Sequence, residues 1–256
     1  MRAALVVALF ALPAAATAQE ERGYTAPRNA VIDAAGATRL TVEAEAGVLR
    51  IVGRAGITQV RVTGTARASH ERYLEEIRLR AVREGDEVRI IAEIPDRNWM
   101  GMGSFYRALD LELEVPASLT ARVTDGSGEA FVRGIAGLEI EDGSGELVVE
   151  DIAGPVRVED GSGELRIRGV RGDVWLRDGS GEVSVRDVTG SLTVARDGSG
   201  EIIAERVGGT VHVREDGSGS IRVADVGGDL RVDEDGSGTI RYDGVKGRVD
   251  IPRRKR

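Results

Sequence analysis

Residues 160–178 read DGSGELRIRGVRGDVWLRD, and this stretch decides the fold. An aspartate stands at each end, and each of the two opens the same tetrapeptide, Asp-Gly-Ser-Gly. Between these turns, apolar side chains at Leu165, Ile167, Val174 and Leu176 alternate with polar or charged ones. A period of two is typical of β-strands that bury one face. The stretch therefore predicts a repeating unit of strand, turn, strand and turn.

The unit recurs along the C-terminal half of the chain. Asp-Gly-Ser-Gly occurs seven times at steps of 17 to 19 residues, and a second turn marker, apolar-x-Gly, ends 12 residues after each aspartate. The seven aspartates are Asp125, Asp142, Asp160, Asp178, Asp197, Asp216 and Asp235. Fixed turn signals at a short period indicate a repeat architecture.

One unit cannot bury its own apolar face, whereas units stacked in parallel can, at a strand spacing of about 4.8 Å. We therefore expect an all-β protein, a parallel β-solenoid (β-helix) with two strands per coil of 18–19 residues. The general crossover preference favours right-handed winding. The competing fold is an antiparallel meander with a hairpin at each apolar-x-Gly. It would leave one apolar face in water and gives no reason for the constant 12-residue spacing.

The first 18 residues resemble a secretory signal peptide. Arg2 supplies the charged start, residues 3–12 are apolar, and Ala16-Thr17-Ala18 gives a small-x-small cleavage site. The apolar run is too short for a membrane anchor, and no later stretch reaches 18 apolar residues, so no transmembrane segment is expected. We expect cleavage near Ala18 and a periplasmic or extracellular mature chain.

The remainder divides into three regions. Residues 19–36 are expected to be a flexible segment, and residues 37–251 a single β-solenoid domain. Within that domain, residues 37–124 predict irregular coils and an N-terminal cap, and residues 125–251 the regular repeats. Residues 252–256 form a basic tail that would blunt the other end, since an open strand edge invites aggregation.

Composition excludes several classes of function. The formal charge is −8, from 43 acidic and 35 basic side chains, which argues against nucleic acid as a partner. Without cysteine, disulfides and thiol catalysis are excluded. The two histidines, His70 and His212, lie far apart in sequence, so a multi-histidine metal site is not expected.

Serial Gly-Ser-Gly-Glu-Leu-x-Val-x-x-Val-x-Gly units, such as residues 143–154, follow a Leu113-Glu114-Val115-Pro116 strand. This layout resembles the putative adhesin family of bacterial β-strand-repeat proteins, domain of unknown function 4097, over roughly residues 37–251. The resemblance implies a β-helical protein that is exported or associated with the cell envelope. It brings no catalytic residues to transfer.

The aspartates have two interpretations. Stacked with the glutamates that follow five of the turns, they would form a double acidic ridge that could hold weakly bound calcium, whose ligands are oxygen atoms. Those glutamates are Glu129, Glu146, Glu164, Glu182 and Glu201. The interpretation that we favour is turn chemistry, in which Asp bonds to amides two residues on, Gly supplies a positive φ and Ser caps the turn.

Residues 97–106 break the strand pattern and concentrate aromatic and methionine side chains. Trp99, Met100, Met102, Phe105 and Tyr106 are the candidate binding residues, because such side chains are typical of contact surfaces. The alternative, which we favour, is that they plug the end of the solenoid core.

These observations predict an exported, non-enzymatic module of the cell envelope with an adhesin-like binding or scaffold role and no catalytic residues. Its expected partner is an envelope component or another protein, and no cofactor is expected beyond weak calcium. One alternative is a carbohydrate-active β-helix enzyme, which a pocket holding one strongly perturbed carboxyl would reveal. The other is a purely structural protein whose solenoid ends stack between molecules.

Overall fold

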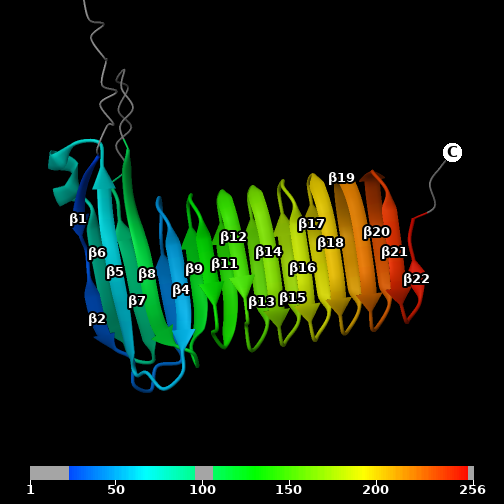
Figure 1. Ribbon diagram of the computed structural model, residues 1–256, viewed down its shortest axis with the longest axis horizontal. Helices are drawn as coiled ribbons and strands as arrows, with labels where there is room; N and C mark the ends of the chain where they lie inside the picture. The colour runs from blue at the N-terminus through cyan, green and yellow to red at the C-terminus, as the bar shows by residue number, and fades with distance from the viewer. Residues whose placement is uncertain (1–22, 96–105, 253–256) are drawn as a thin grey trace, which may run out of the picture.

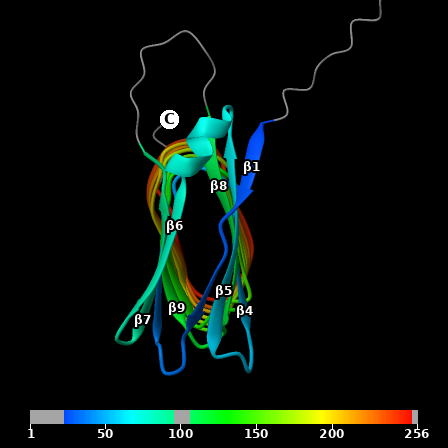
Figure 2. The ribbon, with the colours of Figure 1, turned by 90° about the vertical axis from the view of Figure 1, so that its left-hand side faces the viewer.

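The computed structural model describes residues 23–95 and 106–252, which form an elongated stack of β-coils. Figure 1 shows the coils following one another along the long axis, with β22 at the C-terminal end. Figure 2 looks along that axis and shows a flattened ring with two long sides. Each long side is a sheet, and every regular coil contributes one strand to each sheet.

Sheet A contains the strands that follow the Asp-Gly-Ser-Gly turns, together with the strands at the N-terminal end that pair with them. They are β1 (Tyr24–Pro27), β2 (Ala30–Asp33), β5 (Gln59–Ala68), β8 (Arg107–Pro116), β4 (Leu49–Arg54), β10 (Ala130–Arg133), β12 (Gly145–Glu150), β14 (Gly163–Val170), β16 (Val183–Val188), β18 (Gly200–Val207), the second part of β19 (Val211–Val226) and β21 (Ile240–Val245).

Sheet B contains the strands that end on the repeated aspartates and those that continue this sheet at either end. They are β6 (Arg78–Glu84), β7 (Glu87–Glu93), β3 (Arg39–Glu43), β9 (Thr120–Asp125), β11 (Gly137–Asp142), β13 (Val156–Asp160), β15 (Val174–Asp178), β17 (Leu192–Asp197), the first part of β19, β20 (Leu230–Ser237) and β22 (Val249–Asp250). One short 3-10 helix, η1 (Glu71–Glu76), completes the described residues.

Strand pairing confirms the parallel solenoid. Leu147 pairs with Leu165 in sheet A, and Val156 pairs with Val174 in sheet B, both in parallel register and one coil apart. The antiparallel meander is therefore wrong, because equivalent residues of successive units stack instead of meeting across hairpins.

The predicted alternation places the core. Leu165, Ile167, Val174 and Leu176 are at most 1% exposed, whereas Trp175 between the last two lies on the outer face. Burial of a side chain of this kind contributes roughly 1.5–3 kcal/mol relative to exposure. The hydrophobic effect thus drives the coils together along the whole stack.

Glycine is required at the Asp-Gly-Ser-Gly turns for two reasons. Gly181 has a φ of +141°, a conformation that side chains rarely adopt. A Cβ atom there would lie 1.6 Å from the carbonyl oxygen of Gly163 in the preceding coil. The turns of adjacent coils therefore touch backbone to backbone, and the predicted positive φ is confirmed.

At the N-terminal end, the order of strand pairing is less regular than in the repeats. Strand β3 pairs with β7 and β9, and β4 pairs with β8 and β10, so the β3–β4 coil lies between strands that follow it in sequence. The antiparallel strands β5 and β6 then flank β8 and β7. Strand pairing before Asp125 thus departs from the regular order of the repeats, and the division at residues 37–124 and 125–251 stays a prediction.

The expectation of a flexible segment over residues 19–36 needs correction for its described part. Strands β1 and β2 both pair antiparallel with β5. Each is only four residues long, and residues 28–29 separate them, so local pattern alone does not reveal them. The ten-residue β5 is long enough to pair with both.

Residues 1–22 and 253–256, which include the predicted signal peptide and most of the basic tail, lie outside the described residues. Within the part of the chain that is described, no helix has the length and apolar character needed to cross a bilayer.

Candidate functional site

The seven repeated aspartates form one column on the inner face of sheet B. The alternation that buries Val156 and Val158 continues to Asp160, so the carboxyl group points inward with the core residues. Pairing places each aspartate beside its equivalents in the neighbouring coils, from Asp125 to Asp235. The column therefore runs beside the apolar core through seven coils.

A change in coil length does not disturb this column. One residue separates Leu176 from Asp178 in β15, whereas two separate Val194 from Asp197 in β17. The register shifts by one residue after Leu176, as at a β-bulge, and Asp178 still pairs with Asp197. The bulge takes up the extra residue and keeps the aspartate inward.

The carboxyl groups are withdrawn from water. The six aspartates from Asp125 to Asp216 are 0–6% exposed, and their carboxylate oxygens have no hydrogen-bond partner of ordinary geometry in the described structure. At the N-terminal end the column stops at Ala44, because Glu43 pairs with Thr124 and Ala44 is next in register with Asp125. At the other end, Asp235 is partly exposed.

The electrostatic cost of this arrangement is large. Ionised carboxylates about 4.8 Å apart repel by roughly 3.5 kcal/mol per pair at an effective dielectric constant of about 20. Burial and then the neighbouring carboxyls raise the pKa of Asp160 to about 7 and that of Asp197 to about 8. Burial and then Asp142 raise the pKa of Asp125 to about 6.

The remaining interior members shift in the same direction. Burial is the main reason that the pKa values of Asp142, Asp178 and Asp216 are raised. A column of full negative charges is therefore not the state that these residues favour at neutral pH.

The structure corrects the double acidic ridge. The glutamates after the turns lie on the outer face of sheet A, where Glu146 and Glu164 both contact Arg166, while the aspartates lie inside. The turn interpretation has partial support for aspartate. The backbone amides of Ser162 and Ser180, two residues on from Asp160 and Asp178, act to lower the pKa of those carboxyls, although burial raises it more and neither carboxylate accepts a hydrogen bond of ordinary geometry.

Calcium requires six to eight oxygen ligands. Two adjacent coils offer two carboxyl groups, and over residues 23–95 and 106–252 no three His, Asp or Glu side chains are grouped as a metal site. The Asp142 carbonyl beside the column accepts a hydrogen bond from the Gly161 amide. The calcium hypothesis stays a prediction, and it needs ligands from beyond the column.

Four of the candidate binding residues, Trp99, Met100, Met102 and Phe105, lie outside the described residues. The fifth, Tyr106, is 47% exposed, and its backbone carbonyl accepts a hydrogen bond from the Ser69 amide. Tyr106 directly precedes β8, so it stands where a strand of sheet A begins.

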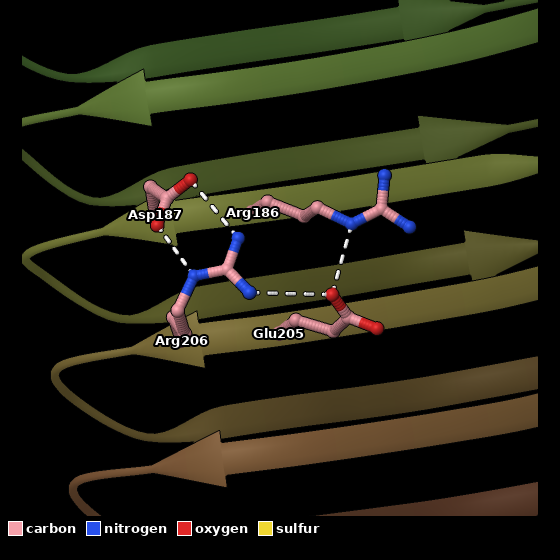
Figure 3. A network of polar contacts seen from close by, with 4 residues as sticks. All are labelled: Arg186, Asp187, Glu205 and Arg206. Atoms are coloured by element: carbon pink, nitrogen blue, oxygen red, sulfur yellow. Dashed lines mark hydrogen bonds and ion pairs between the residues drawn. The ribbon is translucent and has the colours of Figure 1, made fainter.

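The outer faces carry charged side chains that pair between coils. Figure 3 shows Arg206 donating to both carboxylate oxygens of Asp187, at 2.6 and 3.1 Å. Glu205 accepts from Arg186 at 3.0 Å and contacts Arg206. The hydrogen bond from Arg206 holds the pKa of Asp187 below its usual value.

Two further contacts on the outer face of sheet B join neighbouring coils. The guanidinium of Arg157 lies 3.5 Å from the ring centroid of Trp175, and His212 Nε2 lies 2.8 Å from a carboxylate oxygen of Asp233. The outer surface is thus a regular lattice of polar contacts between successive coils.

Fold and site together define an all-β solenoid with charged flat faces and an internal acidic column. A solved structure with this architecture, a "putative adhesin" from Bacteroides fragilis, is 11% identical with a TM-score of 0.52, over 86% of this chain and 97% of that one. At this identity the likeness concerns the fold alone.

Two further solved structures are similar at lower TM-scores. A "putative cell adhesion protein" from Clostridium sporogenes is 11% identical (TM-score 0.36, 88% of this chain and 99% of that one). A "putative lipid binding protein" from Parabacteroides distasonis is 17% identical (TM-score 0.39, 87% and 96%). No family model and no curated protein matches the sequence, so the specific family that it resembles is not confirmed.

Proposed function

We propose that the protein is an exported, non-enzymatic β-solenoid that acts as a binding or scaffold module of the cell envelope. The observation that carries this proposal is the pair of flat, charged faces, whose outward side chains recur once per coil and are tied together by ion pairs. A flat surface with a regular repeat can bind an extended partner, and a rigid stack of coils can act as a spacer. Export rests on the signal-peptide pattern of residues 1–18.

The positions of the perturbed carboxyls support a role without catalysis. A glycosidase needs two carboxyl groups that are accessible to a sugar substrate, and one of them has a raised pKa. In this chain the strongly raised pKa values belong to Asp160 and Asp197, which lie inside the coils and are at most 5% exposed. A polysaccharide cannot reach either group without separation of the coils.

The proposed contact residues are Trp99, Met100, Met102, Phe105 and Tyr106. Support comes from the residue types and from the exposure of Tyr106 beside β8. Aromatic and methionine side chains bury large apolar area on contact with a partner.

Cosedimentation of residues 19–256 with purified envelope fractions tests the proposal. We expect saturable binding that a Trp99→Ala/Met100→Ala variant loses while its melting temperature stays unchanged. Tyr242→Ala is the control, because Tyr242 is an exposed aromatic residue near the C-terminal end, far along the chain from the candidate segment. Absence of binding to every fraction would contradict a binding role, and strong destabilisation of the variant would show that the segment plugs the core.

A further inference from the structure

We infer that the aspartate column is a proton-sharing ladder, in which every second side chain, Asp125, Asp160 and Asp197, binds a proton in the folded protein and donates it to the carboxylate of the next coil. The ligand of this buried site is the proton itself.

The neighbouring aspartates are the groups placed to satisfy each carboxyl. Asp178 of β15 and Asp216 of β19 flank Asp197 in register. On the opposite side of the same coil, β18 turns only apolar side chains inward, such as Ile202 and Ala204.

No cation faces the column among the described residues. Apart from the six buried aspartates, Ser184 is the one polar side chain that is buried there, and it lies on an outward position of β16. A buried carboxylate without a partner is strongly disfavoured. A carboxylic acid beside it provides one O–H donor, and the carboxylate has lone pairs to accept it.

Alternating protonated and ionised aspartates give every carboxylate a hydrogen-bond donor with the fewest bound protons. If Asp125, Asp160 and Asp197 are protonated, each donates its single O–H to the next coil, so the carboxylates of Asp142, Asp178 and Asp216 each have one donor. Such hydrogen bonds between an acid and its conjugate base are short and strong.

The titration behaviour agrees with this geometry. After burial, the charges of Asp178 and Asp142 and then a hydrogen bond with Asp178 raise the pKa of Asp160, and hydrogen bonds with Asp178 and Asp216 raise the pKa of Asp197. Hydrogen bonds with Asp160 or Asp197 act to lower the pKa of Asp142, Asp178 and Asp216, although a hydrogen bond with Asp235 raises the pKa of Asp216. From Asp142 to Asp197 the raised and lowered sets alternate.

The ladder makes folding bind protons. With pKa values of about 6, 7 and 8 for Asp125, Asp160 and Asp197, unfolding should release at least about two protons at pH 6. By pH 8 these three groups should release only about half a proton.

Infrared spectroscopy of the metal-free full chain, labelled with aspartate carrying ¹³C at its carboxyl carbon, tests the ladder directly. At pH 7 we expect a C=O stretching band of protonated carboxyls that shifts with the label and disappears on thermal unfolding. Asp197→Asn should weaken the band and remove about one proton from the release measured at pH 6.

Glu182→Gln is the matched control, since Glu182 follows the same kind of turn but is exposed. It should leave both readouts unchanged. A folded wild-type protein without the band between pH 5 and 8 would overturn the ladder, whatever the variants do. The same absence, with a melting temperature that rises in millimolar calcium, would replace the ladder by a column of cations.

Discussion

Replacing Asp197 by asparagine should stabilise the folded protein, and the gain should grow with pH. Asparagine is close to aspartate in shape and cannot ionise. Its amide nitrogen has two N–H donors for the carboxylates of Asp178 and Asp216, where the protonated acid has a single O–H. The substitution therefore removes the ionisation of one buried group without opening a cavity.

The magnitude follows from the pKa of Asp197, which rises from 3.8 in the free side chain to about 8 in the folded protein. A raised pKa in an acid means that the folded state holds a proton that the unfolded state has lost. The associated stability is fully present below pH 3.8 and is lost as the pH rises to about 8. At about 1.4 kcal/mol per pKa unit, the loss reaches roughly 5 kcal/mol.

Urea unfolding at a series of pH values between 4 and 9 measures this difference. Far-UV circular dichroism and tryptophan fluorescence should report coincident transitions, because a repeat array can unfold in parts. We expect wild type and Asp197→Asn to differ by about 1 kcal/mol or less at pH 4 and by roughly 5 kcal/mol at pH 8. Glu182→Gln should follow wild type throughout.

Two results would refute the reasoning. A stability difference that does not change with pH would show that Asp197 has an ordinary pKa in the folded state. A variant that is less stable than wild type at pH 8 would show that the ionised carboxylate has a favourable partner within the coil.

Other expectations follow from the packing. Gly181→Ala should cost more than about 3 kcal/mol of unfolding free energy, because a Cβ atom would meet the Gly163 carbonyl at 1.6 Å. Gly36→Ala, with φ of +75° but open space around it, should cost only about 1–2 kcal/mol, and thermal melting of both variants checks the contrast. Leu176→Ala should lose roughly 2–5 kcal/mol in urea unfolding, since Leu176 is fully buried. Millimolar calcium should raise the melting temperature at pH 7 and a chelator should reverse it, if weak calcium sites exist. The absence of any shift would end the calcium hypothesis.

The regular half of the fold could be predicted because two local signals coincide there. Alternation around Val174 and Leu176 marks the inward face, and the glycines of each turn mark where the chain must change direction. The order of strand pairing at the N-terminal end could not be predicted from these signals. Leu49 pairs with Leu111 across an insertion of several strands, and no local pattern links those two residues.

The inward direction of the aspartates was missed although a signal for it existed. In Val156-x-Val158-x-Asp160 the period of two continues onto the aspartate. A carboxyl group is costly to bury, so an acidic residue at a turn is normally assigned to the surface. The prediction failed because seven equivalent groups can lower that cost for one another, which no single repeat reveals.

Burial and acidic neighbours together distinguish Asp125, Asp160 and Asp197 along the stack. Asp125 has Ala44 on one side and one acidic neighbour on the other, and its pKa is about 6. Asp160 has two acidic neighbours and a pKa of about 7, and the fully buried Asp197 reaches about 8. Each coil thus adds the same residue but not the same free energy. Because Asp125 loses its proton at the lowest pH of the three and Asp197 at the highest, rising pH should weaken the N-terminal coils of the column before those around Asp197, whereas thermal fraying normally starts at both ends of a repeat array.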